Sequence, residues 1–550
     1  MSAAPIEALF IPFYADIDRW HNDPSPLDEG APPPLVPAVG LSARRARMRP
    51  WALWLDGGAY DLTRFLSWVG TGSTLTHERF DAFRISPLAP HHHASFLTSR
   101  GHEVRVAPVV NRRTLARLAA AYQPRFVLLS TSFFVELDVL GPAVAHLRQS
   151  FPEAAIVLGG QLLLELSKIL TEPAFRLVLR RLGADAYVVS ARGESALAAI
   201  LECGSRAGLL AAPDLPATYV LTGGVARPPA RPVDDEIPLA DGWVRWRGQR
   251  DALYHTVNVR SSRSCAYECA FCSFPVNQGP HAVMPLESFA RELDELAACQ
   301  GVRTLVFTDD TLNVPLPRFK ALCRLLQRYD FQWYGLFRPQ SADQEAVQLM
   351  KASGCAGVFL GLESADDRVL ANMTKHTSVA QLRRGVELLR EHGIWTHGNF
   401  IVGFPGETEA SAWKIPALAD ELELDTFCAS LFILVPSTPI QARRAEFDLE
   451  GQYADWRHAT MTSQQATELA SAVAGGARRA IHLSDLTTQL FWGTILLQTS
   501  GVTREETRVI FRAFDRLRGQ EIGGATLRAA ADVAQVRVIL ERRGLAPAGA

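Results

Sequence analysis

Three cysteines of the chain, Cys265, Cys269 and Cys272, fall within one stretch of eight residues. Their C-x₃-C-x₂-C spacing puts three thiols on one short loop, where each can ligate a different iron of a 4Fe–4S cluster. The fourth iron then has no protein ligand and stays open to a substrate or cofactor. A structural zinc site would need a fourth Cys or His at matched spacing, and the nearest one downstream is His281. The spacing therefore favours an iron–sulfur centre over zinc.

The other five cysteines stand singly, mostly among apolar neighbours, and we expect them to be packing residues: Cys203, Cys299, Cys323, Cys355 and Cys428. A secreted disulfide scaffold would be a short chain with its cysteines spread through it. This chain of 550 residues does not fit that class. No apolar run approaches the roughly 18 residues of a membrane span, and the N-terminus has no basic segment typical of a signal peptide. We expect a cytoplasmic protein with no membrane partner.

Composition indicates a globular chain of several domains. Its 550 residues are 48 % hydrophobic and 21 % charged, with 56 basic against 58 acidic residues and a net charge of −2. At about 150 residues per domain, three to four domains are expected. The balanced charge gives no electrostatic reason to expect a nucleic-acid partner.

The cysteine loop follows the first strand of an alternating series that predicts a partial (β/α)₆ barrel. Chemistry in such a barrel lies at the carboxyl ends of the strands. The expected strands are His255–Arg260, Thr304–Thr308, Gln332–Arg338, Gly357–Leu362, Thr396–Val402 and Thr426–Val435. The expected helices are Pro285–Ala298, Pro317–Tyr329, Ala342–Ala352, Ser378–His392 and Ser411–Leu422.

A first alternating series, from about residue 86, predicts a doubly wound parallel sheet of the Rossmann type. Its strands are expected at Glu103–Val109, Arg125–Ser130, Ala155–Leu158 and Ala186–Ser190, with an isolated candidate at Ala8–Phe13. Ligands of such sheets lie at the carboxyl ends of the strands. Small or hydroxylated residues stand at those ends, where they would let a bulky ligand approach: Ser130, Thr131, Ser132, Gly159, Gly160, Gly193 and Glu194.

These patterns predict an α/β protein whose chain divides into five parts. We expect an N-terminal extension (1–85), the Rossmann domain (86–204), a Pro/Gly-rich linker (205–250), the partial barrel (251–445) and a helical C-terminal region (446–550).

The cysteine loop resembles the signature of the radical S-adenosylmethionine (SAM) superfamily. It follows a first barrel strand and has an aromatic residue, Phe271, directly before the third cysteine. The resemblance implies that Cys265, Cys269 and Cys272 hold a 4Fe–4S cluster whose open iron chelates SAM. One-electron reduction then cleaves SAM to methionine and a 5′-deoxyadenosyl radical.

The resemblance also implies SAM contacts at later strand ends. Asp309 or Asp310 matches the acidic position that faces the SAM ammonium, to which a carboxylate is suited; an Asp pair that caps the next helix is the structural alternative. Glu363 and Ser364 stand where the family presents polar groups to the ribose. The Gly403–Thr408 run, with Gly403 and Glu407, resembles a family hallmark in which glycines allow close approach of the backbone to the cofactor. Arg338 could meet the SAM carboxylate or form a structural ion pair.

The first series resembles the cobalamin-binding domain that precedes the barrel in one branch of this superfamily. The matches are Ser130–Ser132, Gly159–Gly160 and Gly193–Glu194. No Asp-x-His-x-x-Gly motif occurs, so the sequence offers no histidine ligand for cobalt by that route. Three adjacent histidines, His91–His93, cannot all face one ligand, because successive helical residues splay about 100° apart.

The resemblance implies a cobalamin-dependent radical SAM methyltransferase, of class B type, that acts on a small metabolite, at carbon or phosphorus, in natural-product biosynthesis. Two segments, Asn372–Lys375 and Trp456–Met461, are similar in spacing to phosphinate P-methyltransferases, although neither is a diagnostic motif. The alternatives are a non-methylating rearrangement, cyclisation or peptide modification with the same cofactors, and a non-catalytic cobalamin-binding sensor. The expected partners are a small-molecule or peptide substrate and an external one-electron reductant such as flavodoxin or ferredoxin. No second cysteine cluster occurs, so one iron–sulfur cluster is expected.

Overall fold

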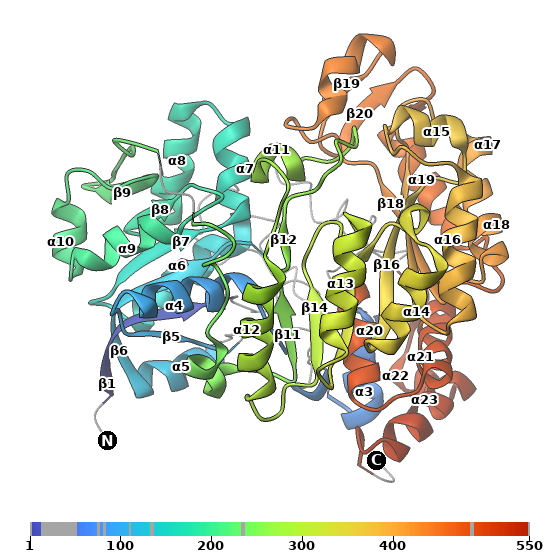
Figure 1. The fold of residues 1–550 in the computed structure, drawn as a ribbon, viewed down its shortest axis with the longest axis horizontal. Helices are drawn as coiled ribbons and strands as arrows, with labels where there is room; N and C mark the ends of the chain where they lie inside the picture. The colour runs from blue at the N-terminus through green and yellow to red at the C-terminus, as the bar shows by residue number, and fades with distance from the viewer. Residues whose placement is uncertain are drawn as a thin grey trace.

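The computed structural model describes residues 3–12, 52–73, 78–80, 84–108, 112–132, 137–232, 237–483 and 489–547. It shows two sheet-based halves side by side, with the chain passing from the first, through the centre, to the second (Figure 1). Within these ranges, no helix is both long enough and apolar enough to cross a membrane.

The first half is built on a seven-stranded sheet in the order β10-β9-β8-β7-β6-β1-β5. Its strands are β1 (Ala4–Ile11), β5 (Val104–Val106), β6 (Tyr122–Ser130), β7 (Ala155–Gly159), β8 (Ala186–Val188), β9 (Thr218–Thr222) and β10 (Val225–Arg227). The pairs from β5 to β8 are parallel, whereas β9 and β10 run antiparallel.

Helices cover both faces of this sheet, which explains why its central strands are buried on both sides. One apolar layer lies under α5 (Arg112–Ala121), α6 (Leu137–Ser150), α7 (Gln161–Ile169) and α8 (Glu172–Leu182). The other lies under α4 (Leu88–Ser99), α9 (Glu194–Glu202) and α10 (Arg206–Ala211). This is the doubly wound arrangement that the alternating pattern predicts.

Two segments depart from the expected division of the chain. Strand β1 falls within the 1–85 segment, yet it lies inside the sheet between β5 and β6, and its bounds are shifted from the predicted Ala8–Phe13. Strands β9 and β10 fall within the predicted 205–250 linker, yet they extend the same sheet. Both differences have one cause. Strand pairing joins segments that are distant in the sequence, and the residues of a strand do not indicate which other strand it will pair with.

The second half contains an eight-stranded sheet in the order β22-β18-β17-β16-β15-β14-β11-β4, and every adjacent pair is parallel. Six strands are those expected from the sequence: β11 (Thr256–Val259), β14 (Thr304–Phe307), β15 (Gln332–Phe337), β16 (Cys355–Glu363), β17 (Trp395–Val402) and β18 (Thr426–Leu431). Short strands β4 (Ile85–Ser86) and β22 (Ile481–His482) flank them. The two ends of the series do not pair, so the sheet is a partial barrel.

The outer layer of the barrel consists of amphipathic helices that begin at clear sequence signals. The helices are α12 (Leu286–Ala297), α13 (Leu316–Leu326), α14 (Gln344–Ala352), α15 (Asp367–Asn372), α16 (Val379–Glu391), α17 (Glu409–Ala412) and α18 (Lys414–Glu421). Helix α16, for example, starts with a capping box in which Ser378 and Gln381 satisfy each other's backbone N–H groups. The barrel and its helices share one large apolar core.

The region after the barrel is mainly helical, as predicted, and also contains short strands. It contains α19 (Ser463–Ala474), α20 (Gln489–Thr499), α21 (Arg504–Leu517), α22 (Gly524–Ala529) and α23 (Ala531–Arg542), but also an antiparallel sheet of β19 (Glu450–Gln452), β20 (Asp455–His458) and β21 (Met461–Thr462). Strands of two to four residues carry too little alternation to be read from sequence.

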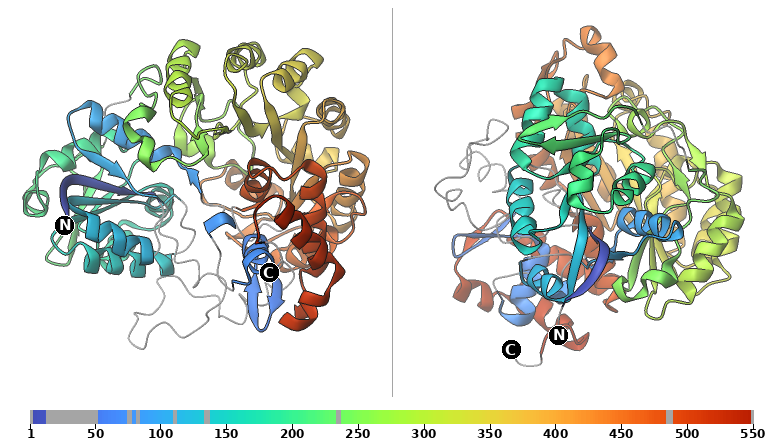
Figure 2. Two further views of the ribbon diagram at one scale, coloured as in Figure 1. Left: turned by 90° about the horizontal axis from the view of Figure 1, so that it is seen from below. Right: turned by 90° about the vertical axis from the view of Figure 1, so that its left-hand side faces the viewer.

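The C-terminal helices pack against a segment from near the N-terminus. Helix α3 (Leu62–Thr71) and the hairpin β2 (Leu53–Leu55)–β3 (Gly58–Tyr60) share a core with α21 and α23, and β2 pairs with β23 (Glu521–Ile522). Figure 2 shows these blue and red segments side by side, away from the first sheet. The 1–85 segment thus contributes to both halves of the molecule.

Candidate functional site

The cysteine loop leaves the carboxyl end of β11, as predicted. It begins with β12 (Ser262–Arg263), which pairs with β13 (Ala282–Val283), and ends in the short helix α11 (Phe274–Gln278). Cys265 and Cys272 are half-buried, Cys269 is buried, and all three thiols are free. The loop therefore presents three unbridged thiols at the mouth of the barrel.

The surroundings of the thiols suit an iron–sulfur cluster better than isolated cysteines. Burial, helped by the neighbouring Cys269, Asp310 and Cys265, raises the pKa of Cys272 to about 11. The Cys272 thiol therefore resists ionisation by itself, whereas iron deprotonates a coordinating thiol outright. Among the described residues, no three ligand-type side chains converge on one point as a single metal ion requires.

A buried cation supports this loop from the third barrel strand. Arg338, 5 % exposed, donates from Nη1 to Cys269 Sγ at 3.7 Å and from Nη2 to the carbonyl oxygen of Lys375 at 2.5 Å. Its guanidinium lies 3.6 Å from the centre of the Tyr267 ring. Arg338, which could meet the SAM carboxylate or form a structural ion pair, thus lies against the cysteine loop and contacts Cys269.

The two aspartates after β14 have different roles in the structure. Asp309 is 1 % exposed and accepts hydrogen bonds from the backbone N–H of Ser261 (2.9 Å) and from the hydroxyls of Ser261 (2.8 Å) and Ser262 (2.5 Å). It therefore holds the segment that leads into the cysteine loop. Asp310 is half-buried and lies within electrostatic reach of Cys272. Burial and the charge of Asp309 raise the pKa of Asp310 to about 7, while Arg260 opposes this rise. Of the pair, Asp310 is the carboxylate that is partly exposed and lies near the cysteine loop.

Glu363 ends β16 in an ion pair that the sequence did not predict. Its Oε1 lies 2.7 Å from Lys375 Nζ, and both side chains are almost fully buried. A Cβ at Gly361 would lie 2.6 Å from Glu363 Oε1 and 2.9 Å from Lys375 Nζ, so the ion pair packs directly on this glycine. Ser364 is buried and accepts a hydrogen bond from the backbone N–H of Asp366, so it acts locally as a turn residue. Lys375 lies in the Asn372–Lys375 segment singled out by its spacing, but nothing in its local sequence marks it as buried.

The Gly403–Thr408 run forms a tight turn that packs on protein. Gly403 has φ +92°, and a Cβ there would come within 2.6 Å of Trp456 and Ala466. Glu407 is fully buried and accepts a hydrogen bond from the backbone N–H of Gly403 at 2.6 Å. Burial raises the pKa of Glu407 to about 8. These contacts show that Gly403 and Glu407 are parts of the turn, and Phe404 of the same run packs on Phe271 of the cysteine loop, with ring centres 6.4 Å apart.

A cavity lies at the carboxyl ends of the strands in the N-terminal sheet, where the sequence predicts cobalamin. Five of the seven residues expected to contact cobalamin line it: Ser130, Ser132, Gly159, Gly160 and Gly193. Gly160 (φ +127°) packs so closely on the Thr131–Ser132 backbone that a Cβ would lie 3.0 Å away. The other two residues point elsewhere: Thr131 donates to the carbonyl oxygen of Gly159, and Glu194 is bonded to His92.

One of the three adjacent histidines faces this cavity. His93 lines it and stacks on Phe10, with ring centres 6.0 Å apart. Burial lowers the pKa of His93 to about 4, and its Nδ1 is buried with no hydrogen-bond partner among the described residues. His91 instead bonds to Gln249 and His92 to Glu194. A neutral ring with an unsatisfied nitrogen, beside a cradle of glycines and serines, fits a ligand with polar groups.

The cavity and the cysteine loop are joined by direct contacts between the two halves. Helix α7 follows Gly160, and α11 follows Cys272. Asn277 of α11 bonds to Lys168 and Glu165 of α7. Gln278, the last residue of α11, also lines the cavity. The loop that would hold a cluster therefore continues directly into the wall of the cavity that would hold cobalamin.

Comparison with known proteins identifies the barrel. The family model described as the radical SAM superfamily matches residues 259–419, which run from the end of β11 to α18 and include the cysteine loop. The match also spans Asp309, Asp310, Arg338, Glu363 and Glu407.

Curated relatives match part of the chain. An uncharacterised methyltransferase of Pyrococcus horikoshii is 30 % identical over 219 residues, 38 % of this chain and 47 % of that protein. A tryptophan 2-C-methyltransferase of Streptomyces laurentii is 28 % identical over 28 % of each chain. An anaerobic magnesium-protoporphyrin IX monomethyl ester cyclase of Cereibacter sphaeroides is 26 % identical over 39 % of this chain and 36 % of that protein. The matched part spans less than half the length of these relatives.

Solved structures extend the likeness in fold to both halves. TsrM from Kitasatospora setae, a radical SAM methyltransferase solved with cobalamin and a 4Fe–4S cluster, has a TM-score of 0.52 at 20 % identity, over 66 % of this chain and 72 % of that one. The cobalamin-dependent enzyme OxsB has a TM-score of 0.50 at 12 % identity, over 84 % of this chain and 74 % of that one. The chain therefore carries a radical SAM domain at residues 259–419, within the fold of the cobalamin-dependent radical SAM enzymes TsrM and OxsB.

Proposed function

We propose that the protein is a cobalamin-dependent radical SAM methyltransferase that acts on a small metabolite. The observation that supports this most directly is the junction between the halves: the cysteine loop of the barrel runs through α11 into the wall of the strand-end cavity in the N-terminal sheet. Two cofactors held on either side of this junction would share one reaction space.

Each cofactor has a set of residues that would hold it. Cys265, Cys269 and Cys272 would ligate the cluster, with Arg338 offsetting their charge. When bound, the reduced cluster supplies the electron that cleaves SAM, and cobalamin supplies a methyl carrier. Asp310 would accept hydrogen bonds from the SAM ammonium at the edge of the loop. We place the electron source outside the chain, in a one-electron donor such as flavodoxin or ferredoxin.

The cobalamin cavity would be held open by residues without bulk. Gly159, Gly160 and Gly193 leave room at the strand ends, while Ser130 and Ser132 offer hydroxyls to polar groups of the ligand. His93 would present its ring from the α4 side. The role of these residues is to bind and orient, and to exclude water from the space between the two halves.

Two products of SAM test the proposal without knowledge of the substrate. We expect the anaerobically reconstituted protein, with cobalamin and a chemical reductant, to form both 5′-deoxyadenosine and S-adenosylhomocysteine, measured by liquid chromatography and mass spectrometry. The second product records methyl transfer from SAM. With a substrate present, each turnover adds about 14 Da to it. Formation of 5′-deoxyadenosine alone would favour a rearrangement or cyclisation with the same cofactors, and absence of both would contradict the proposal.

Filling the cavity tests the cobalamin part separately. Gly193 lines the cavity, and a Cβ there would have His93 at 3.9 Å and Val188 at 3.5 Å, so Gly193→Leu projects a side chain into open space. We expect this variant to lose most of its bound cobalamin, measured by visible absorption after gel filtration, and to keep its iron. Gly141→Leu is the matched control, because nothing lies within 4 Å of its added Cβ. Equal cobalamin content in both variants would place cobalamin elsewhere.

A further inference from the structure

Two side chains from the barrel contact two of the three cysteine sulfurs directly. The guanidinium of Arg338, which follows β15, donates from Nη1 to Cys269 Sγ at 3.7 Å. The hydroxyl oxygen of Thr311, in the loop after β14, lies 2.9 Å from Cys265 Sγ. Both side chains are buried, so little water weakens these contacts. Two of the sulfurs that would ligate the cluster therefore have a polar partner each.

The other contacts of the Arg338 guanidinium are with neutral groups. Nη2 donates to the carbonyl oxygen of Lys375 at 2.5 Å, the guanidinium lies 3.6 Å from the centre of the Tyr267 ring, and the side-chain amide of Gln340 lies within hydrogen-bond distance of Nε and Nη2. Among the described residues, no carboxylate forms an ion pair with Arg338. A buried cation is costly unless an anion lies beside it. Thiolates at Cys269 and its neighbours would supply that anion.

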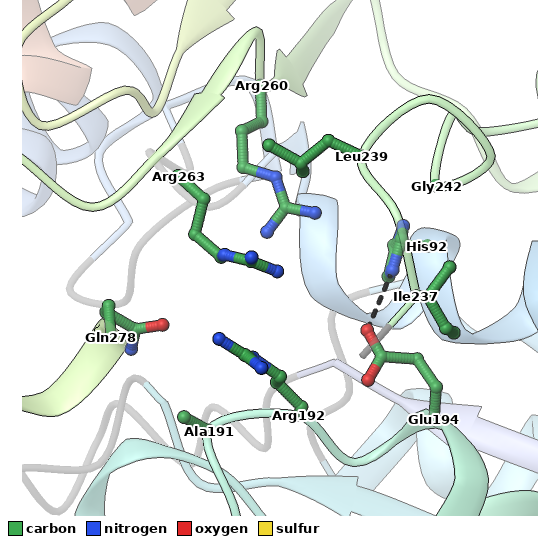
Figure 3. A pocket seen from close by; sticks show the side chains of 10 residues that line it. All are labelled: His92, Ala191, Arg192, Glu194, Ile237, Leu239, Gly242, Arg260, Arg263 and Gln278. Atoms are coloured by element: carbon green, nitrogen blue, oxygen red, sulfur yellow. Dashed lines mark hydrogen bonds and ion pairs between the residues drawn. The ribbon is translucent and has the colours of Figure 1, made fainter. Parts of the chain in front are cut away.

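The two arginines that directly precede the cysteines in the sequence face the junction between the halves. Arg260 directly follows β11, and Arg263 lies on β12. Both line a pocket at the junction, together with Arg192 and Glu194 of the other half (Figure 3). Arg263 lies within electrostatic reach of Glu194, and Arg260 within that of Asp310. Carboxylates therefore offset part of their charge, and the guanidinium placed against a cysteine sulfur comes from the third barrel strand.

The hydroxyl of Thr311 has one proton and two acceptors within reach. Its Oγ1 lies 2.8 Å from the carbonyl oxygen of Asp310 and 2.9 Å from Cys265 Sγ. A neutral Cys265 thiol can donate its own proton to Oγ1, which leaves the hydroxyl proton for the carbonyl oxygen. A thiolate has no proton to donate, and its charge makes it the stronger acceptor. Because iron deprotonates a coordinating thiol, ligation at Cys265 would turn the hydroxyl proton towards the sulfur.

The loop after β14 holds both donors in place. Asn313, two residues beyond Thr311, donates from its side-chain amide to the carbonyl oxygen of Arg338 at 2.9 Å and accepts from the Arg338 backbone N–H at 3.0 Å. Asn313 is fully buried. One loop therefore carries Thr311 and fixes the backbone of Arg338, so the two donors are positioned together against the cysteine loop.

We propose that Arg338 and Thr311 set the reduction potential of the cluster through hydrogen bonds to its ligating sulfurs. Reduction adds one electron, supplied by the external one-electron donor, and makes the cluster more negative by one charge. Hydrogen bonds to the sulfurs and a nearby positive charge stabilise the reduced form more than the oxidised form, so they raise the potential. A milder donor can then reduce the cluster. This inference rests on the cluster of the proposed function and does not depend on cobalamin or on methyl transfer.

The potential of the cluster tests the inference, measured without SAM by a redox titration of the reconstituted protein followed by electron paramagnetic resonance. We expect Arg338→Gln to lower the equilibrium constant for reduction at least about tenfold, which for one electron is a shift of about 59 mV to a more negative potential. Thr311→Val keeps the branched shape of the side chain but loses the hydroxyl, and we expect a change of about threefold, or about 28 mV, in the same direction. Arg338→Lys keeps the positive charge, so its potential should lie between those of the wild type and Arg338→Gln.

Each of these substitutions has a matched control. Arg64 is also a buried arginine that donates to a carbonyl oxygen and lies over a tyrosine ring, but it belongs to α3. Thr308 directly follows β14, and its hydroxyl donates to the carbonyl oxygen of Val259. Arg64→Gln and Thr308→Val should both keep the potential of the wild type. An unchanged potential in Arg338→Gln or in Thr311→Val would overturn the role of that residue. Loss of iron in Arg338→Gln would also overturn the role of Arg338, because the arginine would then serve cluster assembly.

The potential and the products of SAM decide the two proposals separately. If the potential shifts in both variants but the wild type forms neither SAM product, the tuning of the cluster stands and the proposed function fails. If both SAM products form and neither substitution moves the potential, the tuning alone fails. A reconstituted wild type without iron would overturn both.

Discussion

Replacing Cys265, Cys269 and Cys272 together by alanine should reduce bound iron from about four per chain to near zero and lower 5′-deoxyadenosine formation at least about 1,000-fold. The reason is that each thiol would ligate a separate iron, so the loop without them offers no anionic ligand beside Arg338. Iron and sulfide determination and the 410 nm absorption of the reconstituted protein measure the first effect. Product analysis measures the second.

Cys203→Ala is the matched control for this experiment. Cys203 is also a free, half-buried thiol, but it ends α9 in the N-terminal sheet and its Sγ donates only to the carbonyl oxygen of Ala199. It should keep the full iron content. Iron that stays near four per chain in the triple variant would refute the ligand assignment, and iron near eight per chain in the wild type would refute the expectation of one cluster.

SAM should bind more tightly to the wild type as the pH rises from 6 to 8, and Asp310→Asn should remove this dependence. The pKa of Asp310 is raised to about 7, chiefly by burial and then by Asp309. Only the ionised carboxylate accepts strongly from the SAM ammonium, so the wild type gains affinity as Asp310 loses its proton. At pH 8 we expect SAM to bind about ten- to a hundredfold more weakly to the variant. The ratio of the two affinities at each pH cancels the titration of SAM itself.

Without SAM, the same substitution should have the opposite effect on stability. A carboxyl whose pKa is raised from 3.8 to about 7 on folding binds more protons in the folded than in the unfolded state. Its contribution to the free energy of unfolding is full below pH 3.8 and is lost as the pH rises through about 7. Asp310→Asn should therefore gain thermal stability relative to the wild type at pH 8.

Asp309→Asn provides the contrast between the two carboxylates. Asp309 accepts three short hydrogen bonds from Ser261 and Ser262, so its replacement should destabilise the protein and reduce iron loading by loosening the start of the cysteine loop. If Asp309→Asn were the variant with the pH-dependent loss of SAM binding and a normal melting temperature, the two roles would be reversed.

Signals that depend on neighbouring residues allowed much of the fold to be predicted. Alternating strands and helices of the right lengths identified all six predicted barrel strands and four strands of the N-terminal sheet, because a parallel strand buried on both faces is a short apolar run between helices. Pairings between distant segments were not predictable. Strand β1 pairs with strands about a hundred residues away, and α3 packs on helices near the C-terminus. The residue periodicity within β1 or α3 does not indicate these partners.

The candidate site also has features that could be predicted from the sequence and features that could not. The C-x₃-C-x₂-C spacing and the small residues at the strand ends could be read directly, because a tight loop and a strand end are local features. The different roles of Asp309 and Asp310 could not be predicted from the sequence, because they depend on where Ser261 and Ser262 lie in the folded protein. The packing of Gly403 on Trp456 was likewise not predictable, because it joins segments that are distant in the sequence.

The sequence by itself determined the kind of chemistry: three thiols on one loop specify an iron–sulfur centre whatever surrounds them. The tertiary structure decided which groups can take part. It buried Lys375 against Glu363, turned His93 into the strand-end cavity and its two neighbours away, and brought Arg192 from one half to Arg260 and Arg263 of the other. The physical reason is that ligand spacing within a loop is fixed by the covalent chain, whereas charge, burial and orientation depend on contacts made only when distant segments pack together.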